Sequence, residues 1–342
     1  MHQNKLTICI ATFNRAKFLD YLLSSIIDEV NNINGVSIFV ADGCSTDKTN
    51  QVCKKYKESS DSFDFIILNE KGGIDKDFDM AVRHSNSEYC WLFCDDDYIE
   101  KGAIHEIFDK VNLHNPDMMI INSSVCDYEL KNVLLEKSID IDEDIVLSNE
   151  ENVHDKLFEV CKTYLGVTDA LLFRKELWCD VETEVFYGNR FGDMCTIGKF
   201  PKNSKAVIVN HPYVKIRLGN AEWTEISFKI WYEYYPETIN IHSQLSDRVK
   251  KILVPNSFKW KFKFLLSYKA MGSYKLEQYR NYIIKDGFLL AMVGLLILLI
   301  PSIILRYLFI VIALIRKDKL ATYNFSEGRL TKNTWKSDNN SI

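Results

Sequence analysis

The stretch Trp91–Tyr98 reads Trp-Leu-Phe-Cys-Asp-Asp-Asp-Tyr, an apolar run that ends in three adjacent carboxylates. Its first part belongs to a predicted strand, Tyr89–Phe93, because short aromatic and aliphatic runs favour buried strands. The charges of Asp95, Asp96 and Asp97 repel one another unless a cation or hydrogen-bond donors compensate them. Carboxylate oxygens are the ligands that Mg²⁺ and Mn²⁺ prefer. A solvated acidic turn is the alternative, but the buried strand before it favours a metal site.

Similar short runs on either side of this stretch predict four more strands, at Leu6–Thr12, Val36–Asp42, Asp64–Asn69 and Met118–Asn122. The segments between them carry apolar residues at helical spacing, as in Phe18–Ile27. Strands that alternate with helices predict an α/β fold with a mainly parallel sheet and right-handed crossovers. Such sheets bind ligands at the carboxyl ends of their strands, so polar residues at those ends are the first candidates for a site.

The first two predicted strands end in polar side chains. Thr12 and Asn14 follow the first strand, and capping of the next helix explains them as well as ligand contact does. Asp42 closes the second strand, where a carboxylate can accept a hydrogen bond from a nucleobase N–H. Ser45 or Thr46, just after it, is expected to cap a helix.

A glycine turn with charged residues follows the third strand. Gly72 and Gly73 precede a predicted helix that ends near Arg83, and we expect Lys76 or Arg83 to face a diphosphate. The alternative is a capped surface helix with an acid, Asp75 or Asp77, near its positive end.

The second half of the chain holds one further acid of interest. Asp193 follows Gly192 at an apparent helix start, where a helix N-cap is the rival interpretation. Beyond it, polar and aromatic residues follow the last predicted strand, and we expect them to form a flap over donor and acceptor. They are His211, Arg217, Asn220 and Trp223.

The last third is basic and then apolar. Arg248–Lys285 contains ten Lys or Arg and one acid, and Gly287–Leu305 gives nineteen residues without charge, followed by a second apolar run to Ile315. This length meets the ~20 residues needed to cross a bilayer. Because Pro301 interrupts the run and both flanks are basic, a span and a re-entrant hairpin both stay open. The basic stretch suits anionic lipid headgroups.

Composition excludes some classes of protein. The 342 residues carry a net charge of -5, which argues against a general nucleic-acid binder, because phosphate-backbone affinity needs excess Lys and Arg. The nine cysteines form no Cys-x-x-Cys pair and an odd count suits no complete disulfide framework, so we expect reduced thiols. The first residues show no secretory signal, which favours a cytoplasmic N-terminus.

The motifs around Thr12, Asp42 and Asp95–Asp97, in this order, resemble family 2 glycosyltransferases with the GT-A fold over about the first 220 residues. The resemblance implies a Rossmann-like nucleotide-sugar transferase domain. It assigns the donor nucleotide to Thr12, Asn14, Arg15, Asp42, Asp95 and Asp96, and Mg²⁺ or Mn²⁺ to the three acids. Many members have proline where Ala11 stands. The usual Asp-x-Asp pattern appears as Cys94–Asp97, so the metal ligands are either Asp95 and Asp97 or Asp96 and Asp97.

The same resemblance implies that Asp193 deprotonates the acceptor hydroxyl, although many members show Glu-Asp where this chain has Gly192-Asp193. The Gly-Gly-Ile-Asp run and the acidic strand also look like the abequosyltransferase-type subgroup that builds bacterial O-antigen units. We therefore expect an inverting hexosyl- or deoxyhexosyltransferase. Its acceptor would be a glycan on a polyprenyl diphosphate, at the cytoplasmic face of the inner membrane.

These expectations divide the chain into a GT-A domain (1–222, with a nucleotide-sugar half to about 124 and an acceptor half from 125), a basic aromatic helical region (223–286), a hydrophobic membrane segment (287–315) and a polar tail (316–342). Two other functions remain open. One is a non-catalytic membrane protein that binds nucleotide sugars. The other is a nucleotidyltransferase, which is disfavoured because no glycine-rich phosphate loop follows Thr12.

Overall fold

The computed structural model describes residues 4–148, 150–220 and 226–326, which form two compact units. Of these residues, the first unit comprises 4–124, 136–148, 150–216 and 240–249, and the second comprises 125–135, 217–220, 226–239 and 250–326. The boundaries expected from the sequence at 222, 286 and 315 stay predictions.

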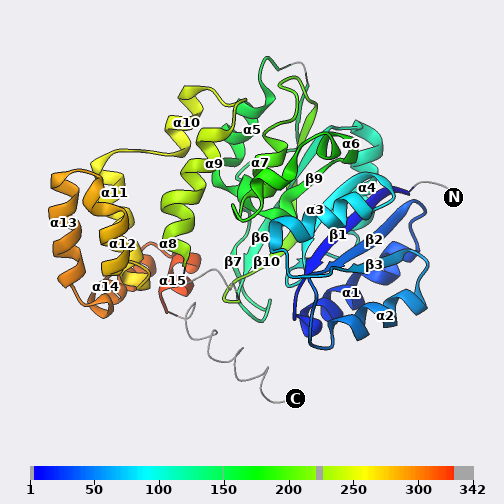
Figure 1. Cartoon of the computed structure of the whole chain (residues 1–342), viewed down its shortest axis with the longest axis horizontal. Coiled ribbons are helices and arrows are strands. Elements are labelled where there is room, and N and C mark those ends of the chain that lie inside the picture. The colour runs from blue at the N-terminus through cyan, green and yellow to red at the C-terminus, as the bar shows by residue number, and fades with distance from the viewer. Residues whose placement is uncertain (1–3, 149, 221–225, 327–342) are drawn as a thin grey trace. The chain divides into compact units, whose positions relative to one another are not determined.

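The first half of the chain alternates strands and helices (Figure 1). Its elements are β1 (Asn4–Thr12), α1 (Ala16–Asn31), β2 (Val36–Asp42), α2 (Thr49–Ser59), β3 (Phe63–Ile67), α3 (Ile74–His84), β4 (Ser87–Cys94), β5 (Tyr98–Ile99), α4 (Ala103–His114) and β6 (Met118–Cys126). The five strands predicted from the sequence are thereby confirmed, with shifts of at most four residues at their ends and none for Val36–Asp42.

Shorter elements follow β6. They are β7 (Val133–Leu135), β8 (Ile145–Leu147), α5 (Val153–Cys161), η1 (Lys162–Gly166), η2 (Thr168–Ala170), β9 (Leu171–Arg174), α6 (Lys175–Cys179), η3 (Thr183–Phe186), α7 (Gly192–Ile197) and β10 (Ala206–Arg217).

The sheet is mixed, in the order β3-β2-β1-β4-β9-β6-β10-β5, with β7 on β6 and β8 on β10. Strands β3, β2, β1 and β4 are parallel, as the alternation with helices predicted. The expectation of a mainly parallel sheet is wrong beyond β4. There β9 inserts between β4 and β6 and runs antiparallel to both.

Both faces of the parallel strands are covered, which explains why β2 is buried at all seven positions. Alternate side chains of β1, Leu6, Ile8 and Ile10, share one core cluster with residues of α1 and α4. Helix α3 packs on the opposite face against β1 and β2 (Figure 1).

From residue 226 the chain is helical. The elements are α8 (Ser227–Lys229), η5 (Ile230–Tyr234), α9 (Tyr235–Ile241), α10 (Asp247–Leu253), α11 (Phe258–Met271), α12 (Leu276–Asn281), η6 (Ile283–Lys285), α13 (Phe288–Leu299), α14 (Ser302–Ile315) and α15 (Lys319–Ser326).

The second unit has a small aromatic core of its own. Phe228 lies at its centre, stacked on Tyr232 and Tyr274, and it meets Phe264 edge to face. The apolar run predicted as a membrane segment forms α13 and α14. Among the described residues no one helix has both the length and the apolar character to cross a bilayer, whereas these two satisfy that test jointly, with a bend of 95° between them. Membrane association of this segment therefore stays a prediction.

Candidate active site

The ends of three parallel strands meet at one edge of the sheet. In the strand register Thr12 pairs with Asp42, and Ala11, one residue earlier, pairs with Cys94. The residue after Cys94 therefore lies beside Thr12, whose hydroxyl donates a hydrogen bond to Asp95 Oδ2 at 2.6 Å. The structure brings together the three motifs, of which the first and the last lie 83 residues apart in the sequence.

The acidic strand end is held by one cation from the first motif. Arg15 Nε lies 2.8 Å from Asp95 Oδ1, and its other nitrogen pairs with Asp96. Asp95 and Asp97 are buried. Burial raises the pKa of the Asp95 carboxyl, while Arg15 opposes that shift. The cluster is therefore an interior group of acids and not a solvated turn.

Two of these acids fit a divalent metal. Ligand atoms of Cys94, Asp96 and Asp97 all lie within 4.8 Å of one another. Burial, together with the surrounding carboxylates, holds the pKa of the Cys94 thiol well above its usual range, and its soft sulfur is a poor match for a hard cation. Asp96 and Asp97 supply the oxygen ligands that Mg²⁺ and Mn²⁺ prefer. Arg15 pairs with both Asp95 and Asp96, but Asp95 also accepts the Thr12 hydroxyl, so both of its oxygens are already bonded.

Asp42 is fully buried and only half satisfied. Its Oδ1 accepts the Ser45 N–H at 2.9 Å, whereas its Oδ2 has no hydrogen-bond partner among the described residues. Burial raises the pKa of this carboxyl. A buried oxygen left without a donor costs free energy, so the position suits an incoming N–H group. Gly43 beside it leaves room for Asp77, whose Oδ2 would lie 2.7 Å from a Cβ there.

Asn14 shapes this edge of the sheet. It has a left-handed backbone with φ of 54°. Its side-chain oxygen accepts the N–H of Thr46 at 2.7 Å and that of Asp47 at 3.3 Å. Asn14 therefore fastens the turn after β2 to the end of β1. Lys76, expected near a diphosphate, forms an ion pair with Glu70 at 3.2 Å.

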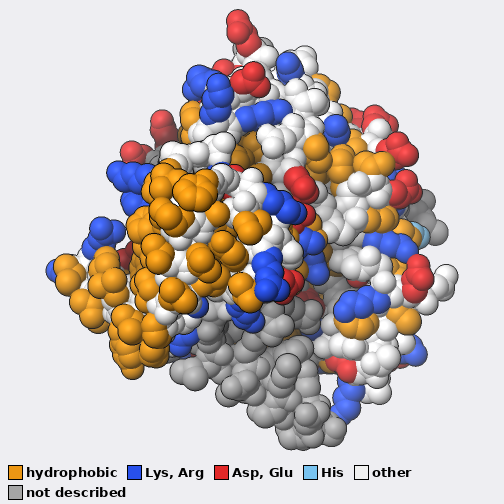
Figure 2. Space-filling view, turned by 60° about the vertical axis from the view of Figure 1, so that its left-hand side comes forward, with side chains coloured by type: hydrophobic (Ala, Val, Ile, Leu, Met, Phe, Trp, Pro, Cys, Tyr) orange, Lys and Arg blue, Asp and Glu red, His pale blue; other side chains and the backbone are white. Residues whose placement is uncertain are grey.

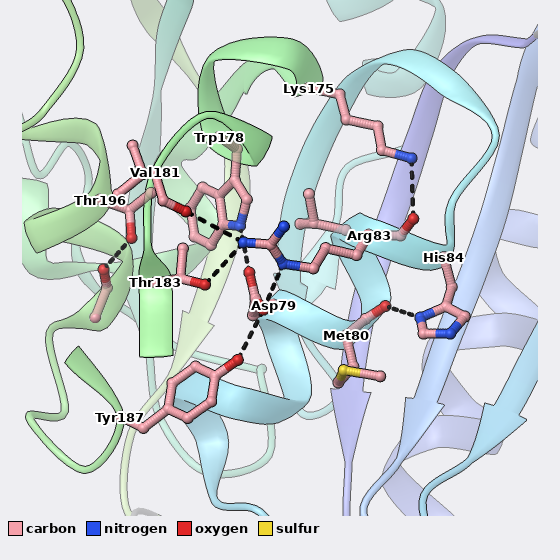
Figure 3. A network of polar contacts seen from close by, with 12 residues as sticks. Asp79, Met80, Arg83, His84, Lys175, Trp178, Val181, Thr183, Tyr187 and Thr196 are labelled. Carbon is pink, nitrogen blue, oxygen red and sulfur yellow. Dashed lines mark hydrogen bonds and ion pairs between the residues drawn. The ribbon is translucent and has the colours of Figure 1, made fainter. Parts of the chain in front are cut away.

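Arg83 lies in a different network, which Figure 3 shows. Its guanidinium bonds Asp79 at 2.8 Å, the Val181 carbonyl at 3.2 Å and the Thr183 hydroxyl at 3.0 Å. Asp79 also accepts hydrogen bonds from Trp178 Nε1 and from the Tyr187 hydroxyl, both at 2.8 Å.

This network joins α3 to α6 and the segment after it. Arg83 stands at the end of α3 that leads into the start of β4, and the acidic cluster follows the end of β4. The structure therefore does not bring Arg83 to the acidic cluster. It gives this residue a packing role that sequence reasoning missed.

Asp193 lies in the first turn of α7 and is 9% exposed. Its Oδ2 accepts a hydrogen bond from the Thr168 hydroxyl at 2.8 Å, and its Oδ1 accepts the Met194 N–H at 2.7 Å. Burial raises the pKa of this carboxyl to about 7. The N-cap of α7 is Phe191, so Asp193 is not the helix cap that the rival interpretation proposed.

Thr168 and its neighbour Asp169 connect Asp193 to the acidic strand. Asp169 is buried, and its Oδ1 accepts the backbone N–H of Cys94 at 2.7 Å. Its carbonyl accepts Trp91 Nε1 at 2.9 Å. Sequence reasoning missed both bridging residues, because their only local mark is an acid just before the apolar run that becomes β9.

Asp75 holds the loop that leads to Asp193. Its Oδ2 accepts the N–H groups of Gly188 at 2.8 Å and Arg190 at 3.1 Å, and its Oδ1 accepts that of Gly192 at 3.1 Å. A Cβ on Gly192 would lie 2.8 Å from Asp75 Oδ1. This close approach explains why glycine stands where the family resemblance led us to expect glutamate.

The expected flap differs from the structure in one respect. His211 lies within β10, with its ring tilted against that of Tyr213 at a centroid distance of 4.5 Å, and not in a loop after the last strand. Arg217 ends β10, belongs to the second unit and donates to the Tyr128 carbonyl. Asn220 follows it in that unit. Trp223 lies outside the described residues.

Comparisons with known sequences agree with this geometry. The model of the family described as glycosyl transferase family 2 matches residues 7–177, half of the chain. An abequosyltransferase of Salmonella typhimurium is 28% identical over 103 residues, 29% of this chain and 30% of that protein. A poly(ribitol-phosphate) β-N-acetylglucosaminyltransferase of Staphylococcus aureus is 26% identical over 117 residues, 34% of this chain and 20% of that protein. The match thus spans less than a third of either relative.

Solved structures extend the likeness of fold to nearly the whole chain. The Staphylococcus aureus TarS fragment 1–349, in complex with UDP-GlcNAc, superposes with a TM-score of 0.60 at 16% identity, over 98% of this chain and 92% of that one. A mannosyltransferase from Pyrobaculum calidifontis, in complex with GDP-Man and Mn²⁺, gives 0.52 at 11% identity, over 98% and 88%. At such identities the likeness establishes the fold alone. With the family match and the strand-end motifs it leads to one conclusion: the chain belongs to glycosyl transferase family 2 and has a Rossmann-like GT-A fold.

Proposed function

We propose that this protein transfers a sugar from a nucleotide-sugar donor to a hydroxyl group of a lipid-linked glycan, with the help of a divalent metal. One observation carries the proposal. The acidic end of β4 and Asp193 are linked through two consecutive residues, because Asp169 bonds Cys94 N–H and Thr168 bonds Asp193. A donor-binding cluster and a base are needed within one site for this reaction.

The donor nucleotide would lie across the ends of β1, β2 and β4. Asp42 is assigned to the nucleobase of the donor, whose N–H would donate a hydrogen bond to Asp42 Oδ2. Thr12, Asp95 and Arg15 would line the ribose and diphosphate, with Asn14 shaping the turn beneath them. Lys76, on the first turn of α3, remains assigned to the diphosphate, which would have to displace its pairing with Glu70.

Asp96 and Asp97 are assigned to Mg²⁺ or Mn²⁺. This choice rests on the cluster of ligand atoms at the end of β4 and on Asp95, whose two oxygens are bonded to Thr12 and Arg15. A metal bound there would stabilise the negative charge of the departing nucleoside diphosphate. The mannosyltransferase of similar fold was solved with GDP-Man and Mn²⁺, which supports the assignment.

Asp193 is assigned as the general base. With a pKa of about 7, roughly half of the Asp193 side chains are ionised at neutral pH, and the carboxylate is basic enough to accept a proton. It would take the proton of the acceptor hydroxyl as the new bond to the anomeric carbon forms and the bond to the diphosphate breaks. One direct displacement of this kind inverts the anomeric configuration.

The acceptor is proposed to be a glycan on a polyprenyl diphosphate, at the cytoplasmic face of the bacterial inner membrane. By their names, two relatives transfer abequose and modify poly(ribitol-phosphate), respectively, which supports a cell-surface polymer such as an O-antigen. The exposed apolar helices α13 and α14 support attachment to the membrane, with the basic stretch on anionic headgroups. His211, Arg217, Asn220 and Trp223 remain assigned to donor or acceptor contacts.

A thermal-shift panel of UDP, CDP, GDP and TDP, with and without Mn²⁺, tests the donor site. We expect one nucleotide to raise the melting temperature only when the metal is present. Asp96→Ala and Asp97→Ala should abolish that increase, whereas Asp109→Ala, on the exposed face of α4, should preserve it. No shift with any nucleotide would contradict the donor site.

Turnover separates an enzyme from a non-catalytic binding protein. Asp193→Asn should lower sugar transfer by roughly 10²–10⁴-fold, the usual contribution of a general base, and leave nucleotide binding intact. Unchanged turnover in this variant would remove Asp193 from the mechanism. Binding without any transfer by the wild type to lipid-linked acceptors would favour the non-catalytic alternative.

A further inference from the structure

Helices α13 and α14 expose apolar outer faces to solvent. On α13 the exposed side chains are Phe288, Leu289, Met292, Leu295, Leu296 and Leu299, and on α14 they are Ile303, Ile304, Tyr307, Leu308, Val311, Leu314 and Ile315. Phe288 is 85% exposed. Figure 2 shows hydrophobic side chains gathered over this part of the molecule, with Lys and Arg at their border. We call the thirteen side chains the apolar surface.

The inner faces of both helices are already in use. Leu290, Gly294 and Ile297 of α13 are buried, and the two large side chains among them belong to the aromatic core around Phe228. On α14, Leu305 and Ala313 are buried. Each helix therefore has one side that packs on the protein and one side that faces outward. The apolar surface consists of side chains that do not pack within the second unit.

The geometry of the pair does not suit a membrane crossing. At 1.5 Å per residue the 12 residues of α13 and the 14 of α14 are about 18 and 21 Å long, short of the ~30 Å hydrocarbon core. The 95° bend prevents their lengths from adding. Both helices pack on α11, and the hydrophobic side chains on their outer sides lie together on the surface (Figure 2).

Charge marks both ends of the pair. Lys285 is exposed just before α13, and Arg316, Lys317 and Lys319 are exposed just after α14. Cations on both flanks place both ends on the same side of a membrane under the positive-inside rule. A second copy of the chain is a poorer partner. If the apolar surfaces of two copies docked in either direction, the cations that flank one surface would lie against those that flank the other and repel them.

We propose that the apolar surface inserts into one leaflet of an anionic bilayer, with α13 and α14 lying in the plane of the membrane and the flanking cations on the headgroups. This inference rests on the membrane attachment proposed above and specifies how the two helices lie relative to the bilayer. The segment neither crosses the bilayer nor enters it as a hairpin. Its two ends stay on one side.

Flotation of the full-length protein with vesicles tests the surface. We expect the wild type to float with phosphatidylglycerol–phosphatidylcholine vesicles, and Leu296→Glu or Leu308→Glu to weaken binding at least tenfold. Leu113→Glu is a matched control, because Leu113 is 75% exposed on α4 of the other unit. Variants that bind as well as the wild type would overturn the proposal, as would a wild type that dimerises and ignores vesicles.

A charge variant tests the headgroup contact. Replacing Arg316, Lys317 and Lys319 by glutamine should lower affinity for anionic vesicles by roughly fivefold per charge and leave the weaker binding to pure phosphatidylcholine unchanged. An equal loss on both kinds of vesicle would contradict an anionic partner.

Depth distinguishes an in-plane surface from a hairpin. An environment-sensitive fluorescent amino acid at Leu296 or at Ile300, next to the bend, should be quenched best by lipids brominated near the headgroup. Strong quenching at Ile300 by lipids brominated deep in the chains would overturn the in-plane arrangement. The metal-dependent nucleotide shift should survive in Leu296→Glu, so failure of the surface and failure of the donor site are read separately.

Discussion

At the scale of single residues, the buried carboxyl of Asp193 predicts how activity depends on pH. Because its pKa is raised to about 7 and only the carboxylate can accept a proton, sugar transfer should rise as pH increases through about 7. The measurement is kcat against pH from 5.5 to 8.5 at saturating donor. A profile that is flat across this range would remove Asp193 from the rate-determining proton transfer.

The same carboxyl predicts an opposite trend in stability. Its pKa is higher in the folded protein than the 3.8 of a free side chain, so the folded state holds an extra proton between these values. The stability from Asp193 is present below about pH 4 and is lost as pH rises through 7. At pH 8 the free energy of unfolding of Asp193→Asn should therefore exceed that of the wild type by a few kcal/mol, since each pKa unit corresponds to ~1.4 kcal/mol.

Urea titrations at pH 4.5 and pH 8 measure this difference. The gap between Asp193→Asn and the wild type should shrink markedly at the lower pH. Asp109→Asn serves as a control, because Asp109 is exposed on α4 and should leave stability unchanged at both values. A gap of equal size at both pH values would show that burial of charge is not its cause.

At the scale of elements, Asp75 couples the start of α3 to the loop before α7. Asp75→Ala removes the acceptor of three backbone N–H groups, and Gly192→Ala places a methyl group against the same carboxylate. Both changes should lower kcat at least tenfold with little effect on nucleotide binding. Removing the Asp75 charge should also lower the apparent pKa of Asp193, because that charge raises it. An unchanged pH profile in Asp75→Ala would contradict the coupling.

The network around Asp79 is predicted to serve stability. Asp79→Ala leaves Trp178 Nε1, the Tyr187 hydroxyl and Arg83 without their acceptor, and breaking a buried pair in this way costs roughly 3–5 kcal/mol. Asp79→Ala should melt at a lower temperature. Arg83→Met should lower the melting temperature too, without raising KM for the donor. If Arg83→Met raised the KM for the donor and left stability unchanged, Arg83 would instead be assigned to the donor site.

At the scale of the whole molecule, the parts of the site that strand ends supply were predictable. Thr12, Asp42 and Asp95–Asp97 each follow an apolar run, and parallel strands bring their carboxyl ends together. Thr168 and Asp169 were not predictable. Their place depends on β9 entering the sheet beside β4, which is a long-range pairing with no local pattern.

The arrangement of the C-terminal helices was also not predictable from the sequence. Apolar length indicated a membrane segment, but α13 carries apolar residues all around its axis, so periodicity does not reveal which side of this helix packs on the protein. The 95° bend at the break near Pro301 was likewise not derivable from length. The inner face of α13 is identified by the packing of Leu290 and Ile297 in the aromatic core of the second unit, to which this helix belongs.

The apolar surface predicts how the purified protein behaves. Large exposed apolar patches drive association in water, so the full-length chain should form polydisperse oligomers without detergent and a single small species with it. A Leu296→Glu/Leu308→Glu double variant should be monodisperse in buffer alone. Light scattering coupled to size exclusion measures this, and a monodisperse wild type in plain buffer would contradict the exposure of the surface.

The bridge formed by Thr168 and Asp169 has a consequence for engineering. Thr168 binds Asp193, the proposed base, and Asp169 holds the strand that carries the acidic cluster. Under the proposed function, the donor-binding and acceptor-binding parts should therefore not be exchangeable independently. A chimaera that joins the first 124 residues of this protein to the remainder of a relative would inherit a foreign pair at this junction. Only crossovers that keep Trp91–Asp97 together with Thr168–Asp169 from one parent should yield working hybrids.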